Sequence, residues 1–238
     1  MSASAALRVE RPNQVYDRLR MLIVRGRIGP GVRIVENDIA ERLGVSRTPA
    51  REAILRLYQE GFLVATDTTR RVELAVAPLT RDDLVDLYRI MGALEGSASR
   101  GLELLAEPRR RELVRDLKDL ESRFESAAGE KKIDYDQVFE RHNAFHERLM
   151  ASCAAPRHRV LLETVRPQVE RYEWVYAPLV GPDYSASFAE HEDIIKAVRD
   201  GSAKRIRRAV AANWDMGAAR LAIVIGEAGP KGDWSVVD

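Results

Sequence analysis

Apolar residues recur every three or four positions along most of the chain, a spacing that places them on one face of an α-helix. At the N-terminal end this pattern predicts three helices, over residues 12–27, 36–43 and 47–60. The patterns stop at the Gly-Pro-Gly stretch 29–31, at Gly44 and at Gly61, residues that commonly end helices. The third helix would bury Ala50, Ala53, Ile54 and Leu57.

After Gly61 the pattern changes to that of β-strands. Phe62–Ala65 and Val72–Val76 are predicted as two short strands, joined by a polar tip over residues 66–71. Three helices followed by a two-stranded hairpin form the outline of a winged helix-turn-helix. We therefore expect a DNA-binding domain over residues 8–77, followed by a short linker around Pro78.

The rest of the chain has helical period throughout. Candidate helices cover residues 80–106, 108–128, 134–153, 157–176, 183–200 and 202–226. Thr80, Asp134, Asp183 and Ser202 stand where N-cap residues belong. The fold class is therefore mostly α: a winged helix-turn-helix with a small β-hairpin, then an all-α six-helix bundle over 80–226. Residues 227–238 would form a flexible tail.

Composition narrows the class of protein. The chain is 45% hydrophobic and 32% charged, which excludes a disordered or collagen-like chain, and its one cysteine excludes a disulfide scaffold. No run of about 18 apolar residues predicts a membrane span, and no apolar signal core follows Met1. We therefore expect a cytoplasmic protein with no membrane partner.

Charge divides unevenly between the two predicted domains. The formal net charge is +1, but residues 1–77 hold 13 Arg, no Lys and 9 acids, while residues 78–238 carry −3. A basic first domain and a slightly acidic second one indicate different partners. Arginine suits phosphates and guanine edges because its guanidinium is a planar fork of donors.

The turn at Gly44 and the helix after it predict the DNA contacts. Polar groups at the start of a recognition helix reach bases in the major groove. We assign Arg47 and Arg51, four apart on one face, to phosphate or guanine contacts, and Ser46, as N-cap, and Thr48 to the DNA backbone. Further candidates are Arg33 for a phosphate, and Arg70 and Arg71 for the minor groove. The alternative is that all are solvated charges on a small bundle.

Residues 12–77 resemble the winged-helix domain of the GntR family of bacterial transcription regulators. The stretches that carry the resemblance are Gly29-Pro30-Gly31, the run DIAERLGVSRTPAREA at 38–53 and the run LYQEGFL at 57–63. The resemblance implies that Ser46, Arg47 and Arg51 touch operator DNA. Where the family often has Arg-Gly at the wing, this chain has Arg70-Arg71, which removes the backbone freedom of that glycine.

Histidines suggest a site in the second domain. His142 and His146 share one helix face, and His191 and Asn213 lie on later helices. Imidazoles that converge inside a bundle can bind a divalent metal, although such a pair is also common in cores and on surfaces. The pair lacks the Glu of a His-Glu-x-x-His motif, and there is neither a phosphate loop nor a Gly-x-Ser-x-Gly elbow. We therefore expect no enzyme.

The second domain resembles the FCD effector domain of the FadR subfamily of GntR regulators. Leu94-Glu95, Phe145-His146-x-x-Leu149 and His191-x-x-Ile194-x-x-Ala197-Val198 carry the resemblance. It implies a metal or effector pocket at His142, His146, His191 and Asn213, with His142 replacing the usual Asp and Asn213 the last His. Three imidazoles could still bind zinc or nickel, or the pocket could be metal-free. Met91 stands where relatives often have an arginine that anchors an anion.

Together these features predict a ligand-responsive regulator that binds a palindromic operator as a homodimer. The resemblance implies a repressor released by a small metabolite, an organic acid in many relatives. One alternative is a metal-dependent small-molecule enzyme with an appended winged-helix domain. Another is a protein that coats DNA without specificity, which the compact first domain and the lack of basic tails disfavour.

Overall fold

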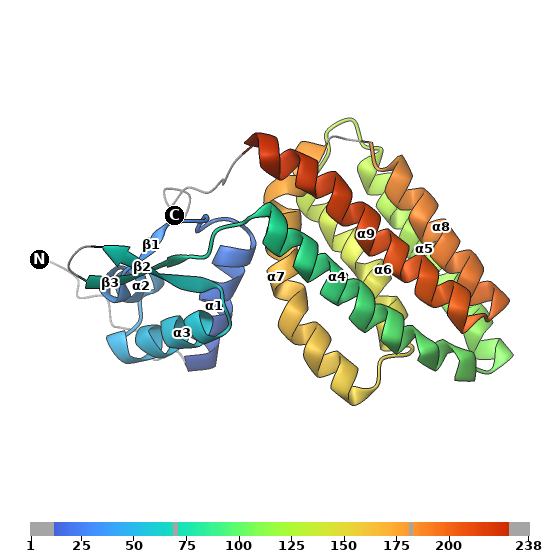
Figure 1. The fold of residues 1–238 in the computed structure, drawn as a ribbon, viewed down its shortest axis with the longest axis horizontal. Helices are drawn as coiled ribbons and strands as arrows, with labels where there is room; N and C mark the ends of the chain where they lie inside the picture. The colour runs from blue at the N-terminus through green and yellow to red at the C-terminus, as the bar shows by residue number, and fades with distance from the viewer. Residues whose placement is uncertain (1–11, 69–70, 181–182, 229–238) are drawn as a thin grey trace, which may run out of the picture. The chain divides into compact units, whose positions relative to one another are not determined.

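The computed structural model describes residues 12–68, 71–180 and 183–228, and the predicted tail falls almost entirely outside this range. The chain divides into two compact units, with the boundary between Leu79 and Thr80. Together they confirm the mostly α fold, with a winged helix-turn-helix followed by an all-α bundle (Figure 1).

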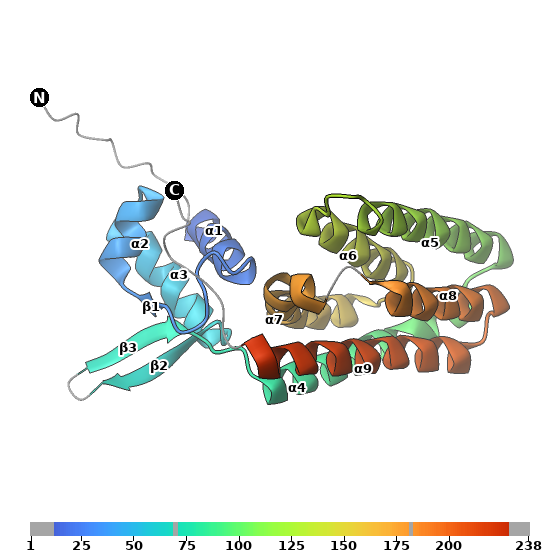
Figure 2. The same cartoon turned by 90° about the horizontal axis from the view of Figure 1, so that it is seen from above.

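The first unit is a three-helix cluster with a small antiparallel sheet. Its elements are α1 (Pro12–Val24), β1 (Arg33–Ile34), α2 (Glu36–Leu43), α3 (Arg47–Gln59), β2 (Leu63–Thr68) and β3 (Arg71–Val76). The strand order is β1-β3-β2, so β3 is central. The hairpin register pairs Leu63 with Val76 and Thr66 with Glu73. Figure 2 shows β2 and β3 extending together as a ribbon away from the helices of this unit.

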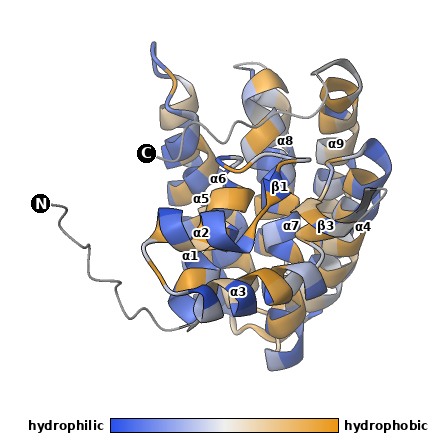
Figure 3. Ribbon diagram, turned by 90° about the vertical axis from the view of Figure 1, so that its left-hand side faces the viewer, coloured by the Kyte–Doolittle hydropathy of each residue, from blue (hydrophilic) through white to orange (hydrophobic). Residues whose placement is uncertain are grey.

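The turn between α2 and α3 sets the direction of the recognition helix. Gly44 has φ of 68°, a left-handed conformation that costs glycine little. The N–H of Val45 then donates to the carbonyl of Ala40 (2.9 Å), which closes α2 in a Schellman arrangement. The apolar face predicted for α3, at Ala50, Ala53, Ile54 and Leu57, is buried. Figure 3 shows the resulting mixture of polar and apolar residues along α3.

Several predicted boundaries in this unit were wrong. The helix expected to reach residue 27 ends at Val24. The strand β1 was not predicted, because its two residues are too few to show a period. The hairpin strands run further than their apolar residues do, because backbone pairing continues to Thr68 opposite Arg71. Polar side chains do not interrupt a ladder that is formed by backbone groups.

The second unit contains six helices longer than four turns and one short 3₁₀ helix among the described residues. They are α4 (Arg81–Ala98), η1 (Ser99–Leu104), α5 (Glu107–Ala128), α6 (Tyr135–Ala151), α7 (Pro156–Val180), α8 (Ser185–Asp200) and α9 (Ala203–Ala228). α5 packs against α6 and α8, and α4 against α7. Figures 1 and 2 both show α9 beside α4, where Tyr88 meets Trp214 edge to face. No helix in the described part of the chain is long and apolar enough to cross a membrane.

Two of the four predicted N-caps hold their helices through the side chain. The Thr80 hydroxyl accepts a hydrogen bond from the N–H of Asp83, and the Asp134 carboxylate accepts from the N–H groups of Asp136 and Gln137. The Asp183 carboxylate accepts from the N–H of Ser185, one position before the cap proper. These bonds satisfy N–H groups that the first turn of a helix leaves unpaired.

The helix predicted over residues 80–106 is divided. α4 ends at Ala98 and the chain continues as the tighter η1. In η1, Gly101 lies against the carbonyl of Cys153, where a Cβ would come within 2.6 Å of the oxygen. The close approach of these two segments therefore requires glycine, which hydrophobic periodicity does not reveal.

The cap at Asp134 gives a direct test of the fold. Asp134→Ala should lower the free energy of unfolding of the helical unit by about 1 kcal/mol, because two N–H groups of α6 lose their acceptor. Asp134→Asn keeps an acceptor oxygen and should cost less. Urea denaturation followed by circular dichroism measures both. Equal losses in the two variants would show that the cap is not what Asp134 contributes.

Candidate effector pocket and DNA-reading helix

Three of the predicted pocket histidines come together inside the helical bundle. α6 supplies His142 and His146 one turn apart, and α8 supplies His191 from its buried face. One nitrogen from each ring lies within 4.8 Å of those of the other two. His146 and His191 are buried, whereas His142 is partly exposed.

His191 is held by a carboxylate on one side and is unsatisfied on the other. Its Nδ1 lies 2.6 Å from Oε2 of Glu121, and its ring stacks on Phe145 with centroids 4.0 Å apart. Its Nε2 is buried and has no hydrogen-bond partner among the described residues. A metal bound at Nε2 would require the shared proton to lie on Nδ1 and Glu121 to be ionised, the arrangement that metal-binding histidines use.

His146 is oriented in a similar way by Glu95. Its Nδ1 lies 3.2 Å from Oε2 of Glu95, which also accepts from Nε1 of Trp214 at 2.9 Å. Arg166 donates to the other oxygen at 2.7 Å. Burial alone would raise the pKa of Glu95, but His146, Arg166 and Trp214 together lower it below its ordinary value. Glu95 is therefore an anchored carboxylate in the core.

The chemistry of this cluster fits a divalent metal ion. Burial first, and then the neighbouring charges, hold the pKa values of His142 and His191 well below the usual histidine range. Neutral imidazoles are the form that binds metals. Zinc bonded to nitrogen at about 2.0–2.1 Å needs ligands roughly 3.3 Å apart, so small side-chain movements would close the triad. The three rings could hold a metal and leave a position open for a ligand.

Asn213, the fourth predicted residue, is hydrogen-bonded to a neighbouring acid. Its amide nitrogen donates to Oε2 of Glu190 at 2.9 Å. Arg220 binds both oxygens of the same carboxylate. Asn213 nevertheless lines the same cavity as His142 and His146, so the structure brings all four predicted residues into one region but in two hydrogen-bonded groups.

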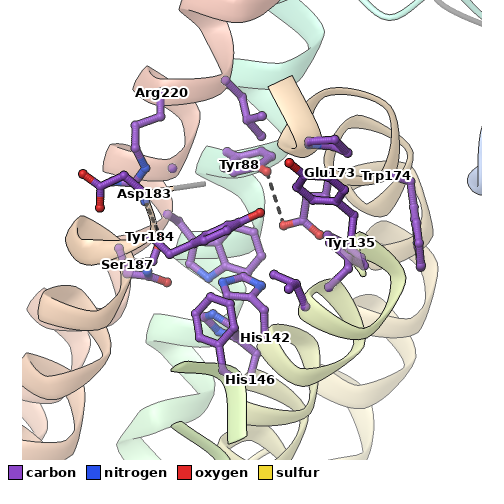
Figure 4. A pocket seen from close by; sticks show the side chains of 18 of the residues that line it. Tyr88, Tyr135, His142, His146, Glu173, Trp174, Asp183, Tyr184, Ser187 and Arg220 are labelled. Carbon is purple, nitrogen blue, oxygen red and sulfur yellow. Dashed lines mark hydrogen bonds between the residues drawn. The ribbon is translucent and has the colours of Figure 1, made fainter. Parts of the chain in front are cut away.

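The cavity beside the histidines has a volume of about 120 Å³. Its walls are largely aromatic, from five helices and the segment before α8: Tyr88, Phe124, Tyr135, Phe139, Trp174, Tyr184 and Trp214. Figure 4 shows His142 and His146 at one end, with Glu173 and Tyr88 toward the other. A mostly apolar cavity with a few convergent polar groups is the usual form of a small-molecule site.

Glu173 is a buried acid in this wall. Its side chain is 6% exposed, and the hydroxyl of Tyr88 donates to Oε1 at 3.3 Å. Burial, with the carboxylate of Glu170 nearby, raises the pKa of Glu173 to about 8. Glu173 is therefore protonated at neutral pH in the free protein.

The recognition helix leaves its predicted DNA-contacting residues in solvent. Ser46, Thr48 and Arg51 are exposed, and the side chain of Arg47 is 73% exposed. No acid lies in the first turn of α3, although Nε of Arg47 lies 3.2 Å from Oε1 of Glu36. Ser46 occupies the N-cap position, but its side chain makes no capping hydrogen bond.

The other predicted contacts lie on the sheet. The Arg33 side chain in β1 is 61% exposed and pairs with Glu73 of β3 at 2.7 Å. Arg71 begins β3, but its side chain, like the whole of Arg70, lies outside what the structure describes. The wing contacts therefore stay predictions.

The carboxylates that organise the pocket carry a signal in the hydrophobic pattern of their helices. Glu95 continues the buried stripe of Tyr88 and Met91 on α4, and Glu121 continues that of Leu117 on α5. An acid at a core position of a helix must find a partner in the interior. The pattern could therefore have identified both acids, but not which histidine each one meets.

Glu173 makes stability depend on pH. An unfolded carboxyl ionises near pH 4.5, but folded Glu173 keeps its proton until about pH 8, so stability is lost as pH rises across this window. The groups around it are Tyr88 and Glu95 on α4 and Arg166 and Glu170 on α7. Glu173→Gln should leave the free energy of unfolding nearly unchanged at pH 5. At pH 9 it should raise that free energy by a few kcal/mol, on the order of what a shift of this size contributes.

Urea denaturation of wild type and variant at several pH values measures this difference. Taking the difference removes the contributions of other groups, including Glu121, whose pKa burial also raises to about 8. Glu163→Gln, at an exposed acid on the same helix, serves as the control. A difference between wild type and Glu173→Gln that is constant from pH 5 to 9 would contradict the burial of an uncharged acid.

Each of the two units matches a known protein family. Residues 12–69 match the bacterial regulatory proteins of the gntR family, and residues 86–215 match the FCD domain. The second match alone covers more than half of the chain. Both families predicted from the motifs are therefore confirmed.

Individual relatives carry names of the same kind. An uncharacterized HTH-type transcriptional regulator of Agrobacterium vitis, from the TAR-I ttuE-ttuC' intergenic region, is 32% identical over 154 residues, which cover 65% of this chain and 85% of that protein. The Nta operon transcriptional regulator of Aminobacter aminovorans is 38% identical over 144 residues, 60% of this chain and 62% of its own.

A solved structure shares the fold. E. coli McbR/YncC superposes with a TM-score of 0.69 at 21% identity, over 90% of this chain and 98% of its own. The relatives are transcription regulators and not enzymes, and GntR regulators with FCD domains bind DNA through one part and small-molecule effectors through the other. The chain belongs to the GntR family of transcription regulators and carries the FCD effector domain of its FadR subfamily.

Proposed function

We propose that the protein is a repressor that binds a palindromic operator as a homodimer and is released by a small metabolite bound in the cavity. Residues 8–77 serve as the DNA-binding domain, and residues 80–226 bind the effector and form the dimer. The observation that carries the proposal is the exposed face of α3, where Arg47 and Arg51 stand one turn apart. The second unit of the same chain contains a ligand-sized cavity.

Operator contact would use the start of α3. Arg47 and Arg51 face a phosphate or the acceptor edge of guanine, and Ser46, Thr48 and Arg33 contact the DNA backbone. Arg47 exchanges its ion pair with Glu36 for the DNA, a small cost because exposed ion pairs contribute little. Arg70 and Arg71 reach the minor groove from the wing. A two-fold dimer then matches a two-fold site.

Effector binding would use the histidine triad and the cavity beside it. His142, His146 and His191 would hold a zinc or nickel ion, with Glu121 and Glu95 fixing the orientation of two of the rings. Such an ion would supply positive charge for a carboxylate such as that of an organic acid. The aromatic walls exclude water and supply contact area for the rest of the ligand.

Regulation requires that the ligand prefer one arrangement of the two units over another. A preference of about 1.4 kcal/mol changes operator affinity tenfold if it is fully coupled. The linker around Pro78 is the segment through which such a change would pass. The name of the Aminobacter relative ties that protein to one operon, and control of a single operon by a metabolite is the role proposed for this chain.

Removing the recognition arginines should weaken operator binding. Arg47→Ala and Arg51→Ala should each raise the dissociation constant about tenfold or more, because each loses a contact of about 1–3 kcal/mol. Neither should unfold the protein, since both side chains are exposed. Gel-shift titration measures the affinity, and Arg109→Ala removes one exposed charge outside the winged unit as a control. Unchanged affinity in both variants would eliminate the assignment.

Removing a triad histidine should remove the metal. His146→Ala should lower the bound zinc or nickel to a small fraction of the wild-type content, because only two imidazoles remain, and should leave operator affinity without ligand intact. Elemental analysis of protein purified without chelator measures the content. His158→Ala is the matched control, since His158 lies outside the triad and contacts Ser97. Wild-type protein with no metal would reduce the triad to a hydrogen-bonding site.

A further inference from the structure

One ionisable group in the cavity wall is not used by the histidine triad. Glu173 is a buried carboxyl whose hydrogen-bond partner, the hydroxyl of Tyr88, is neutral. Arg166, whose positive charge lowers the pKa of Glu173, donates to Glu95 at 2.7 Å. Within the described part of the chain, no lysine, arginine or histidine forms an ion pair with Glu173. An acid buried in this way is costly to ionise until a positive charge arrives.

The rest of the cavity lining also lacks an available positive charge. Asp136 and Asp183 are exposed acids of the lining. Arg220 is the one arginine among the described lining residues, and no lysine is among them. Both of its terminal nitrogens are bound to the carboxylate of Glu190. The protein atoms around the cavity therefore present more negative than positive charge to a ligand.

The aromatic rings of the wall also attract positive charge. Tyr88 and Trp214 meet edge to face with centroids 5.2 Å apart, and Phe139 and Trp174 pack at 4.6 Å. These rings and Tyr184 belong to the wall that includes Glu173. The face of an aromatic ring is negative, so a desolvated ammonium group near several such faces is stabilised. A buried carboxyl among aromatic rings is a favourable place for a protonated amine.

A carboxylate ligand at the same point is less favourable. Protonated Glu173 could donate one hydrogen bond to it, but no lysine is among the described lining residues, and Arg220 is already paired with Glu190. The opposite end of the cavity has different chemistry, because His142 and His146 offer nitrogen ligands or a bound cation there (Figure 4). The two ends therefore suit opposite charges.

We propose that the effector is a small amino acid or related aminocarboxylate, with its ammonium group on Glu173 and its carboxylate toward the histidines. This inference rests on the proposed function, since it takes the cavity as the effector site. A cavity of about 120 Å³ is slightly smaller than the roughly 150 Å³ that holds one benzene ring. A compact molecule, of about the size of valine or smaller, therefore fits within it.

The test is a binding comparison between molecules that differ in the amine alone. Full-length protein is titrated with glycine, alanine and valine, and with the hydroxy acids glycolate, lactate and 2-hydroxy-3-methylbutanoate, which have the same skeletons. Calorimetry and the fluorescence of the wall residues Trp174 and Trp214 report binding. At least one amino acid should bind ten or more times more tightly than its hydroxy acid.

Glu173→Gln should bring that ratio close to one. The amide keeps the size of the side chain and its contact with Tyr88 but cannot carry the countercharge. Glu163→Gln, at an exposed acid on the same helix, should leave the ratio unchanged. The proposal is overturned if no amino acid binds, if hydroxy acids bind equally well, or if Glu173→Gln retains the preference.

Operator binding in the same solutions separates this inference from the proposed function. If hydroxy acids release operator DNA and amino acids do not, the regulator stands and the amine site is overturned. If amino acids bind in a Glu173-dependent way but never change operator affinity, the amine site stands and ligand control of DNA binding is overturned.

Discussion

The helical unit depends on carboxylates that are buried against imidazoles. Glu95 on α4 meets His146 on α6, and Glu121 on α5 meets His191 on α8, so each contact joins two helices through residues that are 51 or 70 positions apart in the chain. Buried polar and charged groups are tolerated only where partners satisfy them, and a group that loses its partner bears the full cost of burial. These pairs therefore fix the positions of the helices and, at the same time, aim the rings at one point.

Glu173 differs from these two acids in its partners, and this difference makes the two ends of the cavity chemically unlike. Glu95 is satisfied by a histidine, an arginine and a tryptophan, whereas Glu173 has a tyrosine hydroxyl. One end of the cavity thus holds nitrogen ligands fixed by paired acids, and the other holds an acid without a countercharge. The attraction between Glu173 and a ligand that supplies the missing charge would be stronger there than in water, because the protein interior screens charges less.

Helical periodicity predicted the six long helices closely because each one buries a continuous apolar stripe. It failed where packing between distant segments decides the conformation, as at η1, where Gly101 meets the carbonyl of Cys153. It also failed for β1, whose two residues carry no period. The histidines could be predicted from their spacing and their resemblance to a known family. Their partner acids, Glu95 and Glu121, could not be assigned, since a core acid reveals that it has a partner but not which helix supplies it.

The claim that one chain joins a sequence-reading helix to a ligand-sensing cavity is tested most directly by selecting bound duplexes from a random DNA pool, with and without the candidate amino acids. The predicted result is enrichment of one inverted repeat, with half-sites about one helical turn apart or closer, and loss of that enrichment when the effector is present. Binding to duplex DNA without any enriched sequence, or enrichment that no ligand of the cavity alters, would contradict it.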